Sequence, residues 1–354
     1  MRAGGADGYG PSTDRSRGGT AHTPNHPARL VPMRIVVLAG GIGGARFLRG
    51  LKATLGIGAE DPQGGSSITV IGNTGDDITL FGLRICPDLD TVMYTLGGGI
   101  NESQGWGRAD ETFTVRAELA AYGMEPQWFG LGDRDVATHI VRAQMMAAGY
   151  PLSAVTEALC DRWRPGVRLI PMTDDRVETH VVVEDEQGRR AIHFQEWWIR
   201  HRAALPAEAI VGVGVEEAKP APGVLEAVAE ADVVLLPPSN PVVSVGSILG
   251  VPGVREAVAA KTVVGVSPII GGAPVRGMAD ACLSAIGVET SARAVAEHYG
   301  SELLDGWLVD ETDAGAAVAG VEVRSRPLYM SDPEATAAIA RAALDLAVEL
   351  KERA

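Results

Sequence analysis

Aromatic side chains, cysteines and long apolar runs are all scarce in this sequence of 354 residues. Aromatics make up 5% of the chain, whereas hydrophobic residues as a whole make up 46% and glycines number 44. That balance is typical of an α/β protein with aliphatic strands and glycine-rich loops. The three cysteines, Cys86, Cys160 and Cys282, are too far apart for a disulfide framework or a zinc site, so we expect a reducing, cytoplasmic setting. No apolar run is long enough to cross a bilayer.

Positive charge is also in short supply. The chain has 31 Lys and Arg against 45 Asp and Glu, which gives a formal charge of −14. Because such a chain repels the phosphates of nucleic acids and anionic lipids, we expect no nucleic-acid partner and no membrane partner. A local basic pocket for one small anion is still compatible with this charge.

The start of the chain differs from the remainder. Residues 1–32 are rich in Gly, Pro, Ser, Thr and Arg and carry almost no apolar side chains. We expect a disordered tail there, because burial cannot offset the entropy of ordering such a segment. Residues 33–354 are long enough to bury a substantial core and are predicted to form a single domain.

Short apolar segments alternate with helical ones through most of the chain, which predicts an α/β fold with a Rossmann-like, mostly parallel sheet flanked by helices. The expected strands are Arg34–Leu38, Ile68–Ile71, Val233–Leu236 and Thr262–Val266, and the expected helices include Pro87–Gly97, Val136–Ala148, Val254–Ala260 and Ala335–Arg353. Residues 170–217, approximately, break this pattern. There ETHVVVE and RAIHFQEWWI flank a turn-like DEQG, so we predict an antiparallel hairpin in an insertion that acts as a lid.

A run of glycines follows the first expected strand and precedes a helix. Gly40, Gly41, Gly43 and Gly44 in that position let backbone N–H groups approach an anion, so we interpret the run as a phosphate or nucleotide site. It is not the dinucleotide fingerprint, because the third glycine is absent, and it lacks the GKS or GKT end of a P-loop. A tight strand-to-helix turn is the alternative interpretation.

Four carboxylates lie in two short motifs, NTGDD after the second expected strand and PDLDT at the start of a helix. Asp76, Asp77, Asp88 and Asp90 are hard oxygen ligands of the kind that Mg²⁺ takes together with substrate phosphates. One of them could instead accept a proton as a general base. Taken singly, Asp88 after a proline is also explained as a helix-capping residue.

Two further loops carry candidate ligand contacts. Asp133 and Arg134 open a helix that contains His139; Arg134 is a candidate anion clamp, whereas Asp133 is also a candidate helix cap and a lone histidine on a helix is more often structural. Ser239 and Asn240, in the motif PPSNP, follow another strand, where open α/β sheets bind ligands. A proline-stiffened loop explains the same motif without a ligand.

Nine motifs in one order identify a family. The chain resembles the 2-phospho-L-lactate transferase family (CofD), most closely its actinobacterial branch (FbiA), over about residues 33–325. The motifs are, in chain order, GGIGGARFLRGL, NTGDD, ICPDLDTVMYTLGGGI, GWG, WFGLGDRDVATHIVR, HFQEWWIR, PAPGVLEAV, PPSNPVVSVGSIL and SPIIGGAPVRGMAD.

The resemblance implies a transferase of coenzyme F-420 biosynthesis that requires Mg²⁺ and uses two small molecules, the deazaflavin precursor Fo and a guanosine diphosphate-linked donor. In that reaction the terminal ribityl hydroxyl of Fo attacks the donor phosphorus that carries the acid, and GMP leaves. The actinobacterial branch implies an enolpyruvyl donor and the product dehydro-F-420-0, and Ile42 and the stretch 276–280 depart from the archaeal pattern in the same direction. A 2-phospho-L-lactyl donor is the alternative. The resemblance also implies a homodimer.

Site residues follow from the same resemblance. Asp90 matches the family's aspartate that contacts Fo, with Thr91 beside it, and Asp76 and Asp90 are the candidates both for catalysis and for holding the metal. The other substrate-binding candidates are Gly40, Gly41, Gly43, Gly44, Asn73, Asp133, Arg134, Ser239 and Asn240.

Two other classes of protein compete with this interpretation. The related gluconeogenesis-factor family contains nucleotide-sugar-binding regulators without catalysis, but its DDGGSSG stretch is replaced here by NTGDD and PDLDT. An NAD(P) dehydrogenase would need GxGxxG and an acidic residue closing the second strand, whereas Ile71 is followed by Gly72 and Asn73.

Overall fold

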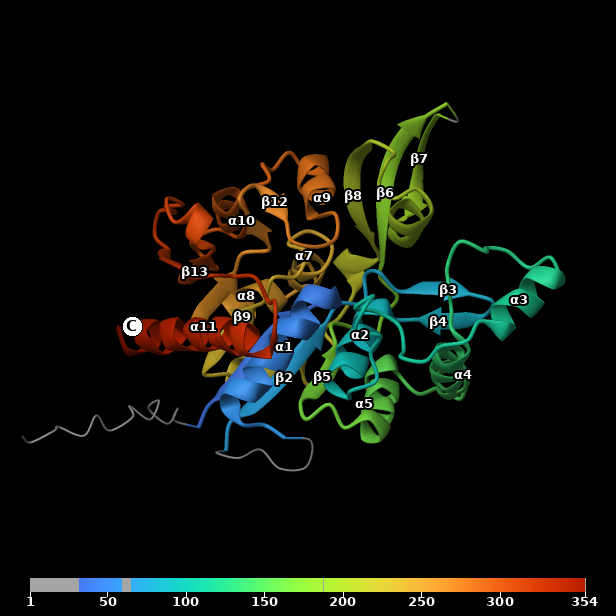
Figure 1. Cartoon of the computed structure of the whole chain (residues 1–354), viewed down its shortest axis with the longest axis horizontal. Helices are drawn as coiled ribbons and strands as arrows, with labels where there is room; N and C mark the ends of the chain where they lie inside the picture. The colour runs from blue at the N-terminus through green and yellow to red at the C-terminus, as the bar shows by residue number, and fades with distance from the viewer. Residues whose placement is uncertain (1–31, 59–64, 187, 354) are drawn as a thin grey trace, which may run out of the picture. The chain divides into compact units, whose positions relative to one another are not determined.

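A sheet of seven strands, all parallel, organises the computed structural model, which describes residues 32–58, 65–186 and 188–353 (Figure 1). Within those residues its strand order is β14-β13-β10-β9-β1-β2-β5. The strands are β1 (Arg34–Ala39), β2 (Ser67–Gly72), β5 (Arg168–Pro171), β9 (Val233–Leu236), β10 (Val263–Val266), β13 (Gly306–Val309) and β14 (Glu322–Ser325). The predicted α/β fold with a parallel sheet is confirmed.

The central strands form because they are aliphatic along their whole length. Every residue of β9 is buried, and in β1 only Arg34 is exposed. Strands buried on both faces read as continuous apolar runs and not as alternating ones, which is why they were recognisable in the sequence. The strands expected at 34–38, 68–71, 233–236 and 262–266 are confirmed to within a residue at each end.

Helices cover the sheet. Along the described part of the chain they are α1 (Gly41–Leu55), α2 (Pro87–Leu96), α3 (Thr114–Ala121), α4 (Asp133–Ala147), α5 (Leu152–Trp163), α6 (Val224–Glu230), α7 (Val245–Leu249), α8 (Val254–Ala259), α9 (Ala279–Ala285), α10 (Ala292–Tyr299) and α11 (Pro333–Arg353), with short turns η2 (Val215–Glu217) and η3 (Glu311–Asp313). Helices α1 and α11 pack against each other, and α11 lies on β9, β10 and β13 (Figure 1). Buried side chains of α6, α7 and α8 join one core with Val36 and Leu38 of β1.

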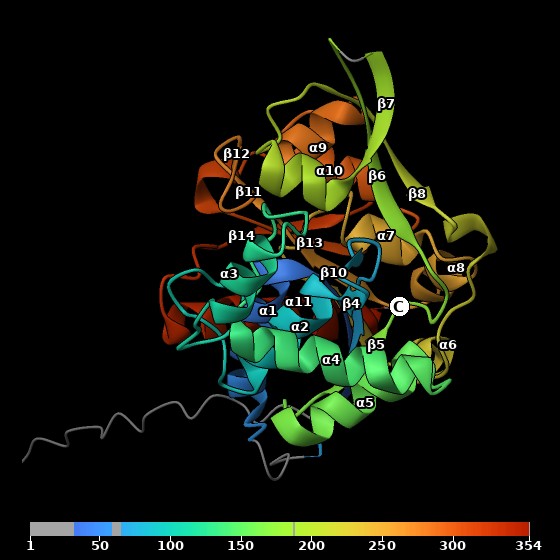
Figure 2. The same ribbon diagram turned by 90° about the vertical axis from the view of Figure 1, so that its right-hand side faces the viewer.

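The insertion contains a three-stranded antiparallel sheet that projects from the main sheet (Figures 1 and 2). Its strands are β6 (Glu178–Asp185), β7 (Gly188–His193) and β8 (Ala207–Val213), in the order β7-β6-β8. The predicted hairpin is β6 and β7; the third strand was missed because the long connection to β8 hides its pairing with the other edge of β6. That connection contains a π-helical turn, η1 (Glu196–Arg200).

Two further pairs of short strands lie outside these sheets, β3 (Ile78–Leu80) with β4 (Leu83–Ile85) and β11 (Ile269–Ile270) with β12 (Ala273–Pro274). Residues 31–354 form one compact unit. The tail expected over residues 1–32 lies, except for Pro32, outside the described residues. No helix among the described residues is both long enough and apolar enough to span a bilayer.

The order of the strands places a switch point beside β1. From β1 the chain runs outward through β2 to β5, then returns to β9 on the other side of β1 and runs outward again to β14. The loops that leave β1 and β9 therefore diverge at the carboxyl edge of the sheet, which is where open α/β sheets bind their ligands.

Candidate active site at the switch point

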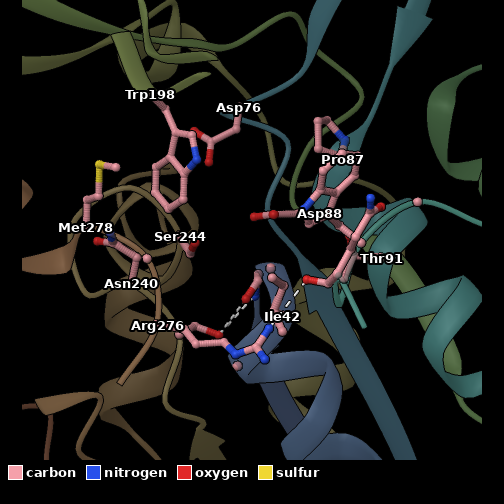
Figure 3. A pocket seen from close by; sticks show the side chains of 18 of the residues that line it. Ile42, Asp76, Pro87, Asp88, Thr91, Trp198, Asn240, Ser244, Arg276 and Met278 are labelled. Carbon is pink, nitrogen blue, oxygen red and sulfur yellow. Dashed lines mark hydrogen bonds between the residues drawn. The ribbon is translucent and has the colours of Figure 1, made fainter. Parts of the chain in front are cut away.

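A cavity of about 990 Å³ opens at this edge of the sheet. Its walls come from the loops after β1, β2, β9 and β10, from α2 and α4, from the insertion, and from the segment before α11. Figure 3 shows side chains from α1, α2, the loops after β2 and β9, and the insertion directed into the same space. A volume of this size suits a ligand larger than a single mononucleotide.

The glycine run brings α1 against the loop that follows β9. The Ser239 hydroxyl donates to the Gly40 carbonyl at 2.8 Å and accepts from the Gly40 amide at 3.2 Å. A Cβ at Gly43 would overlap the carbonyl oxygen of Pro238, and one at Gly44 would lie 2.6 Å from the Ser239 hydroxyl oxygen. Gly43 and Gly44 thus allow close packing between the loops after β1 and β9, in line with the tight turn that was the alternative interpretation of this run.

The cavity lining includes only part of that run. Gly40, Gly41 and Gly43 line the cavity, as do Ser239 and Asn240, whereas Gly44 does not. The Asn240 side-chain oxygen accepts from the amides of Val242 and Val243 at 2.9 and 3.2 Å, so it shapes the turn after β9.

Asp88, in the first turn of α2, lies against the start of α1. Its carboxylate accepts from the Asn73 amide group at 2.9 Å and from the backbone N–H of Gly41, and Ser244 supplies a further hydrogen bond. Burial raises the pKa of Asp88 to about 6, against the lowering effect of these hydrogen bonds. Asn73 is fully buried and absent from the cavity lining, so the structure makes it the support of Asp88.

Asp76 faces the same space as Asp88 (Figure 3). Its side chain is 5% exposed, and its Oδ1 atom has no hydrogen-bond partner. Burial raises the pKa of Asp76 well above its ordinary value, and the nearby carboxylate of Asp88 raises it further. Asp76 and Asp88 are therefore two buried carboxylates that repel each other, one of them with an oxygen that has no partner, and they are the residues that could hold a cation.

Asp90 is held by a different set of contacts. Arg142 of α4, which is 1% exposed, forms an ion pair with Oδ1 of Asp90 and lies 2.9 Å from Nδ1 of His139. Because the guanidinium can only donate, the His139 Nδ1 must accept, which leaves the proton on Nε2, 3.3 Å from Asp135. Oδ2 of Asp90 has no hydrogen-bond partner, and Asp90 lines the cavity.

Three other predicted residues lie away from the cavity lining. Asp77 is buried but pairs with Arg84 at 3.0 Å, facing away into a smaller pocket. Asp133 accepts from the amides of Thr114 and Val115, so it caps α3, and hydrogen bonds from Thr112 and these amides lower its pKa. Arg134 is exposed, and its guanidinium lies 3.9 Å from the carboxylate of Asp110.

Aromatic side chains form much of the remaining wall. Trp106, Trp128, Phe129, Tyr94 and Trp198 line the cavity and offer faces on which a flat ring can stack. Of the tryptophan pair in the insertion, Trp198 is in this wall and Trp197 is a core residue.

The insertion also fixes the acidic loop after β2. The His193 Nε2 donates to the Asp77 carbonyl at 3.0 Å, and the Gln195 side-chain amide donates to the Asp76 carbonyl at 3.2 Å. Burial lowers the pKa of His193, which keeps its ring neutral. Gln195 lines the cavity as well.

Arg142 and Asp135 are the residues that the sequence interpretation missed. Asp135, His139 and Arg142 follow one another at intervals of four and three on α4, so they share one face of the helix. An ionisable stripe on the buried face of a helix was the available signal, whereas the interpretation had considered the motif GDRD and His139 separately.

Comparisons with known proteins agree on one family. The model of the family described as 2-phospho-L-lactate transferase CofD matches residues 35–339. A phosphoenolpyruvate transferase of Thermobifida fusca is 82% identical over 321 residues, which are 91% of this chain and 100% of that protein. One of Streptomyces coelicolor is 71% identical over 326 residues, covering 90% of this chain and all of that protein.

The fold also resembles a solved structure of more distant sequence. A member of the UPF0052 family from Bacillus halodurans superposes with a TM-score of 0.57 at 18% identity, covering 89% of this chain and 100% of that one. At that identity the likeness bears on the fold alone.

Proposed function

The chain belongs to the 2-phospho-L-lactate transferase family CofD, and we propose that it is the phosphoenolpyruvate transferase of coenzyme F-420 biosynthesis. It transfers the phosphoenolpyruvyl group from enolpyruvyl-diphospho-guanosine to the terminal ribityl hydroxyl of Fo. The hydroxyl oxygen bonds to the phosphorus that carries the acid, the bond from that phosphorus to the GMP oxygen breaks, and dehydro-F-420-0 and GMP result. The observation that carries the proposal is the identity of 71–82% to phosphoenolpyruvate transferases over nine-tenths of the chain.

The residues of the cavity fit the Mg²⁺ that the family implies. Among the described residues, no three His, Cys, Asp or Glu side chains form a ready metal cluster. Asp76 and Asp88 nevertheless face one space, and Oδ1 of Asp76 lacks a partner. Since Mg²⁺ takes one or two carboxylates together with substrate phosphates, these two residues would hold it, and it would neutralise the charge of the diphosphate. This pair differs from the predicted Asp76 and Asp90, because one Asp90 oxygen is bound to Arg142.

The chain's own groups then divide the remaining work. Asp90 lines the cavity and accepts the proton of the ribityl hydroxyl of Fo, while Arg142 holds Oδ1 of its carboxylate in place. The start of α1, where Ser239 and Asp88 already accept from the Gly40 and Gly41 amides, takes the phosphates together with Ser239 and Asn240, and the adjoining wall takes the guanosine. Trp128 and the other aromatic walls take the flat deazaflavin ring. Phosphoryl transfer asks mainly for such positioning and charge compensation.

The test is a mass-spectrometric assay of GMP release and of the new phosphodiester. Wild-type protein is mixed with Fo, Mg²⁺ and either the enolpyruvyl or the lactyl diphosphoguanosine. We expect dehydro-F-420-0 from the enolpyruvyl donor. Product from the lactyl donor alone would keep the family and overturn the donor, and GMP release from neither would favour a nucleotide-binding regulator.

Variants of the acidic residues test the division of labour. Asp76→Asn and Asp88→Asn should raise the Mg²⁺ concentration needed for half-maximal turnover. Asp90→Asn should lower kcat by about 10²–10⁴-fold and leave that Mg²⁺ concentration unchanged. Asp133→Asn, which removes a carboxylate outside the cavity lining, is the matched control. An Asp90→Asn protein with normal kcat would reject Asp90 as the base.

We also propose that the protein works in a reducing cytoplasm, which its three free cysteines support.

We further propose a homodimer. Helix α3 has no buried residue, and Phe113, Tyr122 and Met124 beside it are 49%, 83% and 43% exposed. A second copy of the chain would cover this apolar surface. Light scattering after gel filtration should give twice the chain mass, and Tyr122→Glu should shift it toward the monomer; a monomeric wild type would refute the dimer.

A further inference from the structure

Four arginines line the cavity and none of them forms an ion pair among the described residues; two of these, Arg46 and Arg276, lie close to each other. Arg46 lies on α1, one turn after Ile42, and Arg276 follows β12; both line the cavity. In the described part of the chain neither forms an ion pair. Glu102 is the acid whose charge acts on Arg46, and its carboxylate is bound by Arg49 at 2.6 Å.

The two guanidinium groups lie close enough to repel each other. Burial lowers the pKa of Arg46, and the positive charge of Arg276 lowers it further. Arg276 stands beside Ile42 (Figure 3), and its Nη1 donates to the Gln104 carbonyl at 3.4 Å. A backbone carbonyl leaves the positive charge uncompensated, so this corner of the cavity favours an anion.

We propose that Arg46 and Arg276 bind the carboxylate of the acid that the donor carries. This rests on the proposed function, because only that donor brings such an acid into the cavity. A planar guanidinium matches a carboxylate through paired hydrogen bonds. Arg46 lies one helical turn, about 5.4 Å along the axis, from Ile42 at the start of α1. The carboxylate of a group attached to a phosphate at that helix start falls within such a distance.

The same corner is a poorer place for the diphosphate. Asp88, which with Asp76 would hold the metal, accepts a hydrogen bond from the Gly41 amide at the start of α1. The diphosphate needs that metal, whereas a carboxylate can be neutralised by arginines alone. Selection of a donor with a free carboxylate would then depend on Arg276 and Arg46.

Calorimetric titration with two matched probes tests the assignment. One probe is lactyl diphosphoguanosine, in which L-lactate is esterified to the β-phosphate of GDP, and the other is the β-ethyl ester of GDP, which keeps the diphosphate and lacks the carboxylate. In the presence of Mg²⁺, Arg276→Gln and Arg46→Gln should each weaken binding of the lactyl probe by about 10- to 100-fold, as expected for charge-assisted hydrogen bonds. Binding of the ethyl ester should not change.

Arg116→Gln is the matched control, since Arg116 of α3 also lines the cavity and donates to a backbone carbonyl, that of Gln127 at 3.0 Å, but is not among the charges that act on Arg46. Equal losses for both probes would overturn the proposal in favour of a diphosphate site. No loss in either arginine variant, or the same loss in Arg116→Gln, would overturn it as well. Because Arg276 is exposed, its variant should fold even if Arg46→Gln does not.

Turnover is measured separately. If the wild type binds both probes but releases no GMP from its donor in the presence of Fo, the transferase proposal fails. The difference between the two probes still decides whether the arginines bind a carboxylate.

Discussion

The ion pair between Asp90 and Arg142 gives the most direct test of how the cavity is built. Arg142 is 1% exposed and Asp90 is 4% exposed, so neither charge can be solvated if the other is removed. Arg142→Met keeps an unbranched apolar stem but removes the guanidinium, which leaves the Asp90 carboxylate buried and unpaired. Losing one partner of a buried pair costs about 3–5 kcal/mol, and we expect that loss of stability here.

The second variant, Asp90→Asn, strands the guanidinium in the same way and should cost a similar amount. In the double variant Arg142→Met/Asp90→Asn no buried charge is left over. Its free energy of unfolding should therefore be about 2–3 kcal/mol higher than the sum of the two single losses predicts.

Urea unfolding followed by circular dichroism measures all four proteins. The control cycle uses Arg293 and Glu297, an exposed ion pair on α10 at 2.7 Å, which should show no measurable coupling. Additive losses at Asp90 and Arg142 would refute the interpretation that each buried charge is compensated by the other. That result would also remove the reason to regard Arg142 as the support of Asp90.

Three further predictions concern other parts of the site. Gly43→Ala should destabilise the protein by about 1–3 kcal/mol, measured by thermal unfolding, because its Cβ would overlap the backbone of Pro238. Acidification to below about pH 6.5 should loosen the insertion, measured by hydrogen exchange of residues 188–200, because protonated His193 can no longer accept from the Gln195 amide at 3.1 Å. Asp133→Ala should expose the amides of α3 to exchange but leave kcat/KM within about twofold, because Asp133 lies outside the cavity lining.

Each of these has a control. Gly315→Ala should be neutral, because no atom lies within 4 Å of its Cβ position. For His193 the sign follows from a folded-state pKa below the unfolded one: the contribution to stability is full above about pH 6.5 and is lost as the pH falls. His193→Gln should abolish that dependence, and an unchanged pH profile would contradict it. A large loss of kcat/KM in Asp133→Ala would return Asp133 to the site.

The sequence predicted the fold where local pattern and tertiary burial agree. Strands β1 and β9, which are apolar apart from Arg34, and helix α2, which begins with a proline, are examples. Each is recognisable from its own four to ten residues. Strand β8 was missed, since its sequence AEAIVGV is half exposed and its pairing with β6 depends on contacts across the insertion.

The candidate site was predicted as a set of loops but not as a set of contacts. The positions of Asp76, Asp90 and Ser239 at strand ends and a helix start follow from motif and order. Which carboxylate faces which charge does not follow, because Arg142 reaches Asp90 from 52 residues away. The apparent ligand residue Asn73 likewise supports Asp88, a relation that no spacing rule describes.

The hydrogen bonds between Gly40 and Ser239 join residues 199 positions apart. During synthesis, β1, β2 and β5 leave the ribosome well before β9, so β1 spends that interval with one edge of the sheet unpaired. An open edge of an aliphatic strand is a place where nascent chains associate wrongly. The strand at the centre of the ligand site is therefore also the segment of this protein that most needs protection, by a chaperone or by rapid elongation, until residue 236 has emerged.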